Sequence, residues 1–255
     1  MALTLETRDL TIRFGGHAAV NGVSCSFHPG ELTAIVGPNG AGKTTYFNLI
    51  SGQLRASSGS ILFDGHDITH QSAPMRTRAG LGRAFQLTNL FPNLTVEENV
   101  RLAVQAADGT HYDMFRPWMV RRDLIVRADA ILEQVALGSR RNVAATALSH
   151  GDQRKLEVAL MIALEPKVFM FDEPTAGMSI DEVPVVLNLI AQLKQEKSKI
   201  ILLVEHKMDV VRSLADRIIV LHNGQLVADG RPADVIASPV VQEAYLGIAP
   251  GRSAT

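Results

Sequence analysis

Residues 37–45 read Gly37-Pro38-Asn39-Gly40-Ala41-Gly42-Lys43-Thr44-Thr45 and match the phosphate-loop pattern G-x-x-x-x-G-K-[ST]. The apolar stretch 33–36 before it is typical of a strand, and the stretch 46–50 after it is typical of a helix. Glycines let successive backbone N–H groups turn toward one point, where the helix N-terminus adds partial positive charge. We therefore predict that all nine residues surround phosphate groups, with Lys43 reaching the β- and γ-phosphates and the Thr44 hydroxyl binding Mg²⁺. An ordinary glycine-rich turn is the alternative.

The composition is that of a near-neutral chain of 255 residues, with 25 Lys and Arg against 26 Asp and Glu. No basic stripe favours a nucleic-acid partner. The single cysteine, Cys25, excludes an internal disulfide framework and indicates a reducing compartment, and its simplest role is that of a small buried apolar residue. No apolar run reaches the ~18 residues of a membrane helix, and the first residues lack the pattern of a secretory signal. We expect a cytoplasmic protein that acts on a membrane only through a partner.

Two apolar runs predict strands buried on both faces of a parallel sheet. They are residues 168–171 and 200–204. Asn223-Gly224 between two further apolar stretches indicates a hairpin. Since the first forty residues also have β-like alternation, the ends of the chain are expected to build an α/β core.

A helical block is expected between the parts of this core. Residues 95–137 have helical periodicity, interrupted by a polar loop and ending at Gly138. We expect a single domain with a core at about 1–88 and 165–255 and a helical subdomain at about 89–164.

Two carboxylates follow the first buried strand. Asp172 and Glu173 come at the carboxyl end of that strand, where α/β sheets bind ligands. Asp172 is therefore a candidate Mg²⁺ ligand, and Glu173 a candidate to polarise an attacking water. The alternative is a solvated acidic turn before Pro174.

Three other segments hold polar groups suited to an anion. Ser149 and Gly151 precede a predicted helix and could present a hydroxyl and N–H groups to an anion, although the segment taken alone favours an ordinary N-cap and loop. His206 closes the second buried strand and could bind a phosphate oxygen, or be purely structural. Gln86 lies where the core passes into the helical block, with an ordinary loop residue as its alternative.

The order of these motifs resembles the nucleotide-binding domain of ABC ATPases over essentially the whole chain. The resemblance implies a P-loop (RecA-like) α/β fold with an antiparallel β subdomain and an inserted α-helical subdomain. It implies ATP and Mg²⁺ as cofactors and assigns roles to five parts of the chain: Gln86 as the Q-loop glutamine and a Mg²⁺ ligand, residues 149–152 as the signature loop, Glu173 as the catalytic base, His206 as the switch histidine, and Phe14 as the aromatic that stacks on adenine. Strand core is the alternative for Phe14.

Two departures from the family pattern limit this transfer. Residues 148–152 read Leu-Ser-His-Gly-Asp where the commonest form is Leu-Ser-Gly-Gly-Gln, so His150 and Asp152 carry no family role. Ser179 stands where many members have the D-loop aspartate, which puts signalling between subunits there in doubt.

Several stretches, among them 148–159, 204–208 and 243–247, resemble the ATP-binding subunits of bacterial branched-chain amino acid importers. The resemblance implies two integral-membrane permeases, a second ATP-binding subunit (identical or a paralogue), an indirect extracytoplasmic solute-binding protein, no nucleic acid, and a place on the inner face of the membrane. ATPases of urea-type importers or lipopolysaccharide exporters are alternatives. So are soluble ABC ATPases and regulatory binding domains, but the chain has one phosphate loop and no sustained heptads, and Glu173 and His206 are intact.

An apolar segment offers a candidate surface for the permease. Residues 87–94 include Leu90 and Phe91 just before a predicted helix. We expect them to line a groove that receives a short amphipathic helix. A hydrophobic staple onto the following helix is the alternative.

Overall fold

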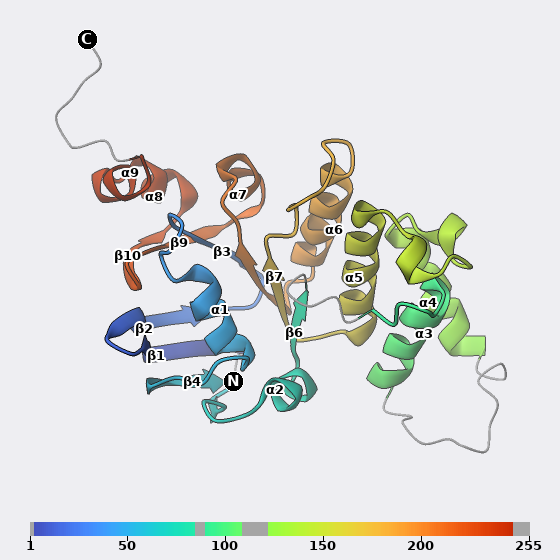
Figure 1. Cartoon of the computed structure of the whole chain (residues 1–255), viewed down its shortest axis with the longest axis horizontal. Helices are drawn as coiled ribbons and strands as arrows, with labels where there is room; N and C mark the ends of the chain where they lie inside the picture. Colours follow the sequence, from blue (N-terminus) through green and yellow to red (C-terminus); the bar gives the residue numbers. More distant parts are fainter. Residues whose placement is uncertain (1–2, 85–89, 109–121, 247–255) are drawn as a thin grey trace, which may run out of the picture. The chain divides into compact units, whose positions relative to one another are not determined.

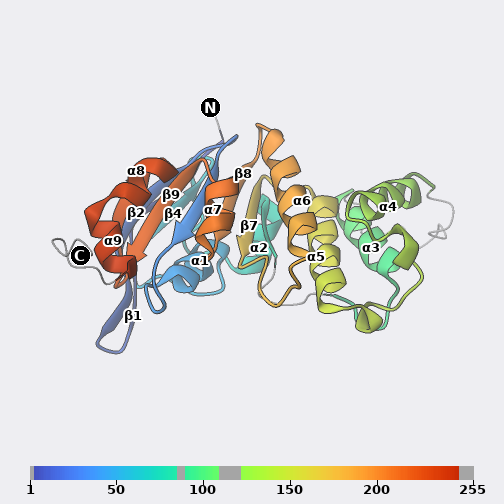
Figure 2. The same cartoon turned by 90° about the horizontal axis from the view of Figure 1, so that it is seen from above.

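The computed structural model of the chain describes residues 3–84, 90–108 and 122–246. These residues form two compact units, whose elements can be followed in Figures 1 and 2. The first unit comprises residues 1–81, 167–173 and 194–255, and the second comprises 82–166 and 174–193. The division into a core and an inserted helical subdomain stays a prediction, because compactness alone does not show which parts form a subdomain.

An antiparallel sheet opens the first unit. Its strand order is β2-β1-β4-β5. The strands are β1 (Leu5–Phe14), β2 (His17–Phe27), β4 (Ser58–Phe63) and β5 (His66–Asp67). Burial alternates along much of β1 and β2, as expected for strands with one face on a core.

A second, mostly parallel sheet has the order β10-β9-β3-β8-β7-β6. Its strands are β3 (Leu32–Val36), β6 (Leu81–Ala84), β7 (Val168–Asp172), β8 (Ile200–Val204), β9 (Arg217–His222) and β10 (Gln225–Gly230). Every residue of β7 and β8 is buried, which confirms the two predicted strands. The predicted hairpin is also confirmed, since β9 and β10 pair antiparallel around Asn223 and Gly224, both with positive φ.

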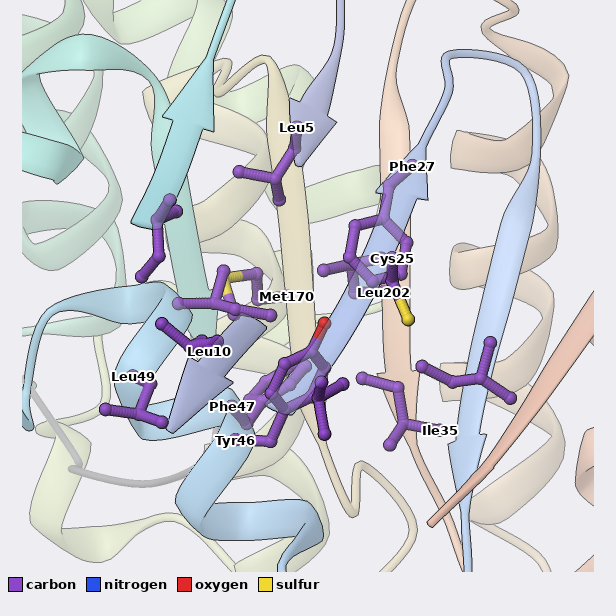
Figure 3. Packing of buried hydrophobic residues seen from close by; sticks show 14 of the residues in the cluster. Leu5, Leu10, Cys25, Phe27, Ile35, Tyr46, Phe47, Leu49, Met170 and Leu202 are labelled. Atoms are coloured by element: carbon purple, nitrogen blue, oxygen red, sulfur yellow. The ribbon is translucent and has the colours of Figure 1, made fainter. Parts of the chain in front are cut away.

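Alternate residues of the parallel strands enter two different cores. Ile35 and Leu202 belong to the cluster in Figure 3, which also contains residues of the antiparallel sheet and of α1 (Lys43–Ser51). Ala34 and Val220 instead join a cluster with residues of α7 (Met208–Leu214), α8 (Pro232–Ala237) and α9 (Pro239–Leu246). Thus α1 and the C-terminal helices pack on sets of residues that alternate along the same strands.

The interior of the first cluster confirms the simple role of Cys25. Its side chain is buried, and burial raises the pKa of the thiol. Beside it, the hydroxyls of Thr7 and Tyr46 are hydrogen-bonded at 2.8 Å, and Thr7 Oγ1 also accepts the backbone N–H of Cys25 at 3.1 Å. These bonds attach α1 to β1 and β2 from its buried side.

The C-terminal end of α1 is closed by a buried arginine. Arg76 belongs to α2 (Ala73–Ala79) and is 1% exposed. Its guanidinium donates to the carbonyl oxygens of Leu49 at 2.6 Å and Ile50 at 2.7 Å, both in the last turn of α1. It also donates to the carbonyls of Thr69 and Gln71. Because its partners are carbonyls, burial lowers the pKa of Arg76 to about 10.

The second unit is mainly helical and contains both helices predicted around the polar loop. Its helices are α3 (Val96–Ala107), α4 (Arg122–Gln134), α5 (His150–Leu164) and α6 (Val183–Gln195) up to residue 193, with short 3₁₀ turns η2 (Gly138–Arg140) and η3 (Ala145–Ala147). Thr95 and Glu98 form a reciprocal capping box that starts α3. Within the residues that the structure describes, no helix is both long and apolar enough to cross a membrane.

The predicted helix end at Gly138 is wrong. Helix α4 ends at Gln134, and Ala136 takes the left-handed conformation with φ 56°. The N–H of the next residue, Leu137, donates to the carbonyl of Leu132 at 2.8 Å while its side chain is fully buried. Burial of Leu137 therefore ends α4 two residues earlier than a left-handed Gly138 after the helix would. Gly138 instead begins η2.

Replacing Arg76 with methionine should destabilise the first unit by about 3 kcal/mol, because several buried carbonyls lose their donors together. Arg78→Met on the exposed side of the same helix is the matched control and should change stability by less than about 0.5 kcal/mol. Urea unfolding followed by circular dichroism measures both. Equal losses in the two variants would show that the bonds of Arg76 contribute nothing specific.

Candidate active site

The predicted phosphate loop joins β3 to α1, and two of its glycines leave no space for a side chain. Gly37 and Gly42 have φ values of 153° and 96°. A Cβ at Gly37 would overlap the carbonyl oxygen of Leu221, and a Cβ at Gly42 would overlap that of Ala19. The loop thus passes too close to neighbouring backbone for any side chain at these two positions.

Helix α1 starts at Lys43 in a way that leaves room for an anion. Its N-cap, Gly42, has no side chain, and within the described residues no side chain caps the helix. Its first turn contains no acidic residue either. The positive end of the helix dipole is therefore not neutralised by the helix's own first turn.

The Lys43 side chain turns back to the backbone of the loop. Its ammonium donates to the carbonyl oxygens of Gly37 at 2.7 Å and Pro38 at 3.0 Å. Burial lowers the pKa of Lys43, while the negative charges of Glu173 and Asp172 oppose that shift. A bound phosphate would add negative charge beside this ammonium and so favour its charged form.

The remaining predicted loop residues form the surface of the turn. Asn39, Gly40 and Thr44 are exposed, Pro38 and Thr45 are half-buried, and Ala41 is buried. Phe14, at the end of β1, is 52% exposed, which does not fit a role as strand core. Its ring is accessible to a planar ligand.

The carboxylates that follow β7 lie in contrasting surroundings. Asp172 is 8% exposed, whereas the Glu173 side chain is 41% exposed. Glu173 has φ 50°, a left-handed conformation that costs a non-glycine residue about 1 kcal/mol or more. Its N–H donates to the carbonyl of Val204 at 2.9 Å, so pairing with β8 maintains the strained turn.

The end of β8 orients His206 toward Glu173. Nδ1 of His206 lies 3.9 Å from Oε1 of Glu173, which is near but beyond hydrogen-bond distance. Sequence reasoning did not identify Glu205, which is fully buried and accepts the backbone N–H groups of His206 at 2.9 Å and Lys207 at 3.1 Å. A charged residue directly after five buried apolar residues was the available signal for this positioning role.

The predicted anion-binding loop before α5 belongs to the second unit. Ser149 is the N-cap of α5, and its hydroxyl oxygen accepts the N–H of Asp152 at 3.1 Å. Gly151 is buried in the first turn. Gln86 lies outside the described residues. The structure therefore brings together Lys43, Asp172, Glu173 and His206 in the first unit, while Ser149 and Gly151 adjoin each other in the second.

Comparison with known proteins gives two family matches. The family model described as ABC transporter matches residues 20–176, and the one described as branched-chain amino acid ATP-binding cassette transporter matches residues 225–249. Together they cover the phosphate loop, the carboxylate pair, and β10 with the C-terminal helices.

Curated relatives align with nearly the whole chain. The high-affinity branched-chain amino acid transport ATP-binding protein BraF of Pseudomonas aeruginosa is 38% identical over 248 residues, which are 95% of this chain and 97% of that protein. LivG of Escherichia coli K12, a protein of the same description, is 37% identical with the same coverage. A probable LivG of Archaeoglobus fulgidus is 34% identical over 95% of each chain.

Solved structures share the fold. The ADP conformation of MJ1267, an ATP-binding cassette of an ABC transporter, superposes with a TM-score of 0.81 at 29% identity, over 97% of this chain and 100% of that one. The dimeric structure of MJ0796, a bacterial ABC transporter cassette, gives a TM-score of 0.76 at 25% identity, over 89% and 98% of the two chains.

Replacing Gly42 with alanine should strain the start of α1, because the new Cβ would meet the Ala19 carbonyl in a left-handed backbone. We expect a loss of about 2 kcal/mol in the free energy of unfolding. Gly16→Ala is the control, since nothing lies within 4 Å of a Cβ at that position. If denaturant titrations give the same loss for both variants, the close approach at Gly42 has no energetic consequence.

Proposed function

This chain belongs to the ABC transporter family of ATP-binding domains, and from that premise we propose that it hydrolyses ATP to drive import of branched-chain amino acids. The observation that carries the proposal is the phosphate loop facing a buried Asp172 and a strained, accessible Glu173. The substrate class is supported by the names of relatives that align with 95% of the chain.

Nucleotide binding follows from the family and from the start of α1. The uncapped N–H groups and the Lys43 ammonium would hold the phosphates, and the exposed Phe14 ring would stack on adenine. In this role Lys43 exchanges its carbonyl partners, Gly37 and Pro38, for phosphate oxygens, which bind an ammonium more strongly because they are charged.

The donor set also fits Mg²⁺. The hydroxyl of Thr44 and the carboxylate of Asp172 are hard oxygen donors, with the predicted amide of Gln86 as a third. Among the described residues no cluster of three or more His, Cys, Asp or Glu side chains could hold a metal. Such a site therefore depends on phosphate oxygens, which is how Mg²⁺ is usually bound with nucleotides. When bound, the ion neutralises charge on the phosphates.

Glu173 and His206 are proposed to act on the water that attacks the γ-phosphate. The Glu173 carboxylate is accessible and lies next to the buried Asp172, so it can accept a hydrogen bond from water and orient it. His206, held by buried Glu205, would donate to a phosphate oxygen. Gln86 would report the state of the phosphate to the helical block.

Ser149 and Gly151 are proposed to bind the γ-phosphate of a nucleotide held by a second subunit. The MJ0796 cassette is described as dimeric, which supports a pair of such chains. Two cassettes would then enclose two ATP molecules, and ATP would drive their association. A homodimer and a heterodimer with a paralogue both satisfy this arrangement.

The site roles can be tested with Glu173→Gln, which keeps the shape of the side chain but removes the base. The variant should bind ATP as tightly as the wild type and hydrolyse it about 100-fold more slowly. Glu196→Gln, at an exposed carboxylate, should leave both properties unchanged. Filter binding of labelled ATP and steady-state phosphate release measure the two. Hydrolysis near the wild-type rate would reject Glu173 as the base.

Membrane partners are proposed to dock on a groove of about 400 Å³ in the second unit. Its walls come mainly from α3 and α5, and its apolar lining includes Phe91, Leu102, Ala103, Leu160, Met161 and Leu164. The only carboxylate among the groove's lining residues, Glu157, is buried and paired with Arg154 at 2.9 Å. A short amphipathic helix of a permease, with its apolar side in the groove, matches this surface.

The backbone of Phe91 is held in place while its side chain stays exposed. The buried Asn99 side chain accepts the N–H of Phe91 at 2.8 Å and donates to its carbonyl at 3.1 Å, and Phe91 is 55% exposed. Asn99 is also at the position on α3 where a hydrophobic staple needs an apolar residue. The staple is therefore contradicted for Phe91. Leu90, next to it, is half-buried and is not among the residues that line the groove, so the expectation holds for Phe91 alone.

Leu90→Ser combined with Phe91→Ser should remove Phe91, the exposed anchor in the groove, together with the apolar residue before it, while the fold and the basal ATPase rate persist. We expect the permeases to be lost on co-purification, and uptake of labelled leucine by cells to fall to background. Val126→Ser, at a position that is 66% exposed in the same unit but outside the groove, is the control. Normal co-purification of the double variant would exclude this groove. If the double variant loses assembly but leucine uptake never depended on the protein, the docking proposal stands and the assignment of branched-chain amino acids as substrate is rejected.

A further inference from the structure

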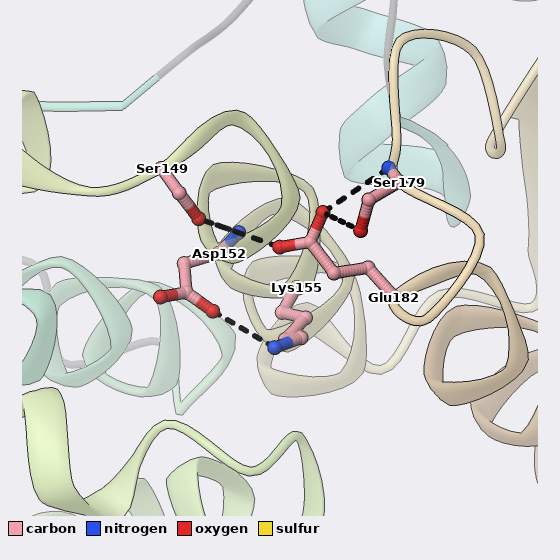
Figure 4. A network of polar contacts seen from close by, with 5 residues as sticks. All are labelled: Ser149, Asp152, Lys155, Ser179 and Glu182. Carbon is pink, nitrogen blue, oxygen red and sulfur yellow. Dashed lines mark hydrogen bonds and ion pairs between the residues drawn. The ribbon is translucent and has the colours of Figure 1, made fainter.

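A carboxylate from the segment before α6 reaches the first turn of α5. Figure 4 shows Glu182 between Ser149 and Ser179. Its Oε1 accepts the Ser149 hydroxyl at 3.5 Å, and its Oε2 accepts the Ser179 hydroxyl at 2.9 Å and the Ser179 N–H at 3.3 Å. All of these residues belong to the second unit.

The same carboxylate covers Gly151. A Cβ at Gly151 would overlap all three carboxyl atoms of Glu182. Only a glycine therefore leaves space for the acid at this place. Asp152, the acid within the first turn of α5 itself, points instead to Lys155, whose ammonium lies 2.8 Å from its Oδ1 (Figure 4).

The position of Glu182 is favourable for an anion. Helix α5 has 15 residues, and the positive end of its dipole lies at Ser149 and Gly151. These two residues are the ones to which the proposed function assigns the γ-phosphate of the second subunit. A carboxylate and a phosphate group have the same charge sign and the same acceptor chemistry, so they compete for this place.

We propose that Glu182 is an internal substitute for the γ-phosphate, which occupies the signature loop until ATP on the second subunit displaces it. This inference rests on the proposed function of Ser149 and Gly151. It makes Glu182 a residue that sets the ATP concentration needed for dimerisation. Ser179, which stands where many family members have an aspartate, would then hold the Glu182 carboxylate after ATP has displaced it from Gly151.

The geometry indicates that displacement is inexpensive. Glu182 has one long contact with Ser149 at 3.5 Å but two bonds to Ser179, the shorter at 2.9 Å. Moving away from Gly151 therefore loses the weak contact and the attraction of the helix dipole, while both bonds to Ser179 can persist. Such an attraction corresponds to about a fivefold change in an equilibrium constant.

The test uses full-length protein with Glu173→Gln, so that ATP is not consumed, and follows the dimer fraction by light scattering during an ATP titration. Adding Glu182→Gln should lower the half-maximal ATP concentration about fivefold. Glu182→Ala, which also removes the bulk, should shift it in the same direction. Asp181→Asn removes the same charge from the neighbouring exposed residue and should leave the midpoint unchanged.

Three results would overturn the proposal. An unchanged or higher midpoint in both Glu182 variants would show that the carboxylate supports the loop rather than competing with phosphate. An equal shift in Asp181→Asn would attribute the effect to net charge. If Ser149→Arg dimerises as readily as its parent, the signature loop does not lie at the interface, and the proposed dimer site fails together with this inference. Failure of the Glu182 variants alone, with dimerisation still dependent on Ser149, leaves the proposed function intact.

Discussion

In the proposed function the first N–H groups of α1 stay open to an anion, and the way the first unit holds this helix is consistent with that constraint. A helix whose first N–H groups are reserved for phosphate cannot be secured by a capping side chain. Other contacts hold this helix: Arg76 donates hydrogen bonds to carbonyl oxygens in the last turn of α1, and the Tyr46 hydroxyl on the buried side of α1 is hydrogen-bonded to Thr7. The close contacts of Gly37 and Gly42 with neighbouring carbonyls define the path of the loop. Hydrogen bonds at the C-terminal end of α1 thus compensate for the missing side-chain cap at its N-terminus.

On the proposed catalytic side of the site, buried polar groups support accessible ones. Asp172 and Glu205 are buried at the ends of β7 and β8, while Glu173 and His206, the next residue in each case, remain accessible. Glu205 binds the backbone of His206, and the pairing of Glu173 with Val204 supports a left-handed turn. The two strand ends therefore present one accessible acid and one accessible imidazole at nearby positions. This arrangement suits a reaction whose main requirements are orientation and electrostatic stabilisation.

The sequence predicted the parts that depend on local pattern. The phosphate loop, the buried strands β7 and β8, and the hairpin at Asn223 and Gly224 each carry a signal within a few residues, and each strand prediction is confirmed. Features set by distant contacts were not predictable. The buried Arg76 pairs with carbonyls 26 and 27 residues away, and Glu182 reaches a serine 33 residues earlier. The predicted helix end at Gly138 was wrong for the same reason, because α4 ends at Gln134, where burial of Leu137 takes the chain out of the helix.

In the proposed function the start of α1 binds the phosphates of a nucleotide and supplies most of the affinity. Isothermal titration of the wild-type chain with ATP, ADP and adenosine in the presence of Mg²⁺ separates the phosphate contribution from that of the base. We expect ATP and ADP to bind and adenosine to bind at least about 100-fold more weakly, because stacking on Phe14 alone is worth only a small part of the total. Adenosine binding within about threefold of ATP would refute phosphate recognition by α1, since the base rather than the helix and its loop would then supply the affinity.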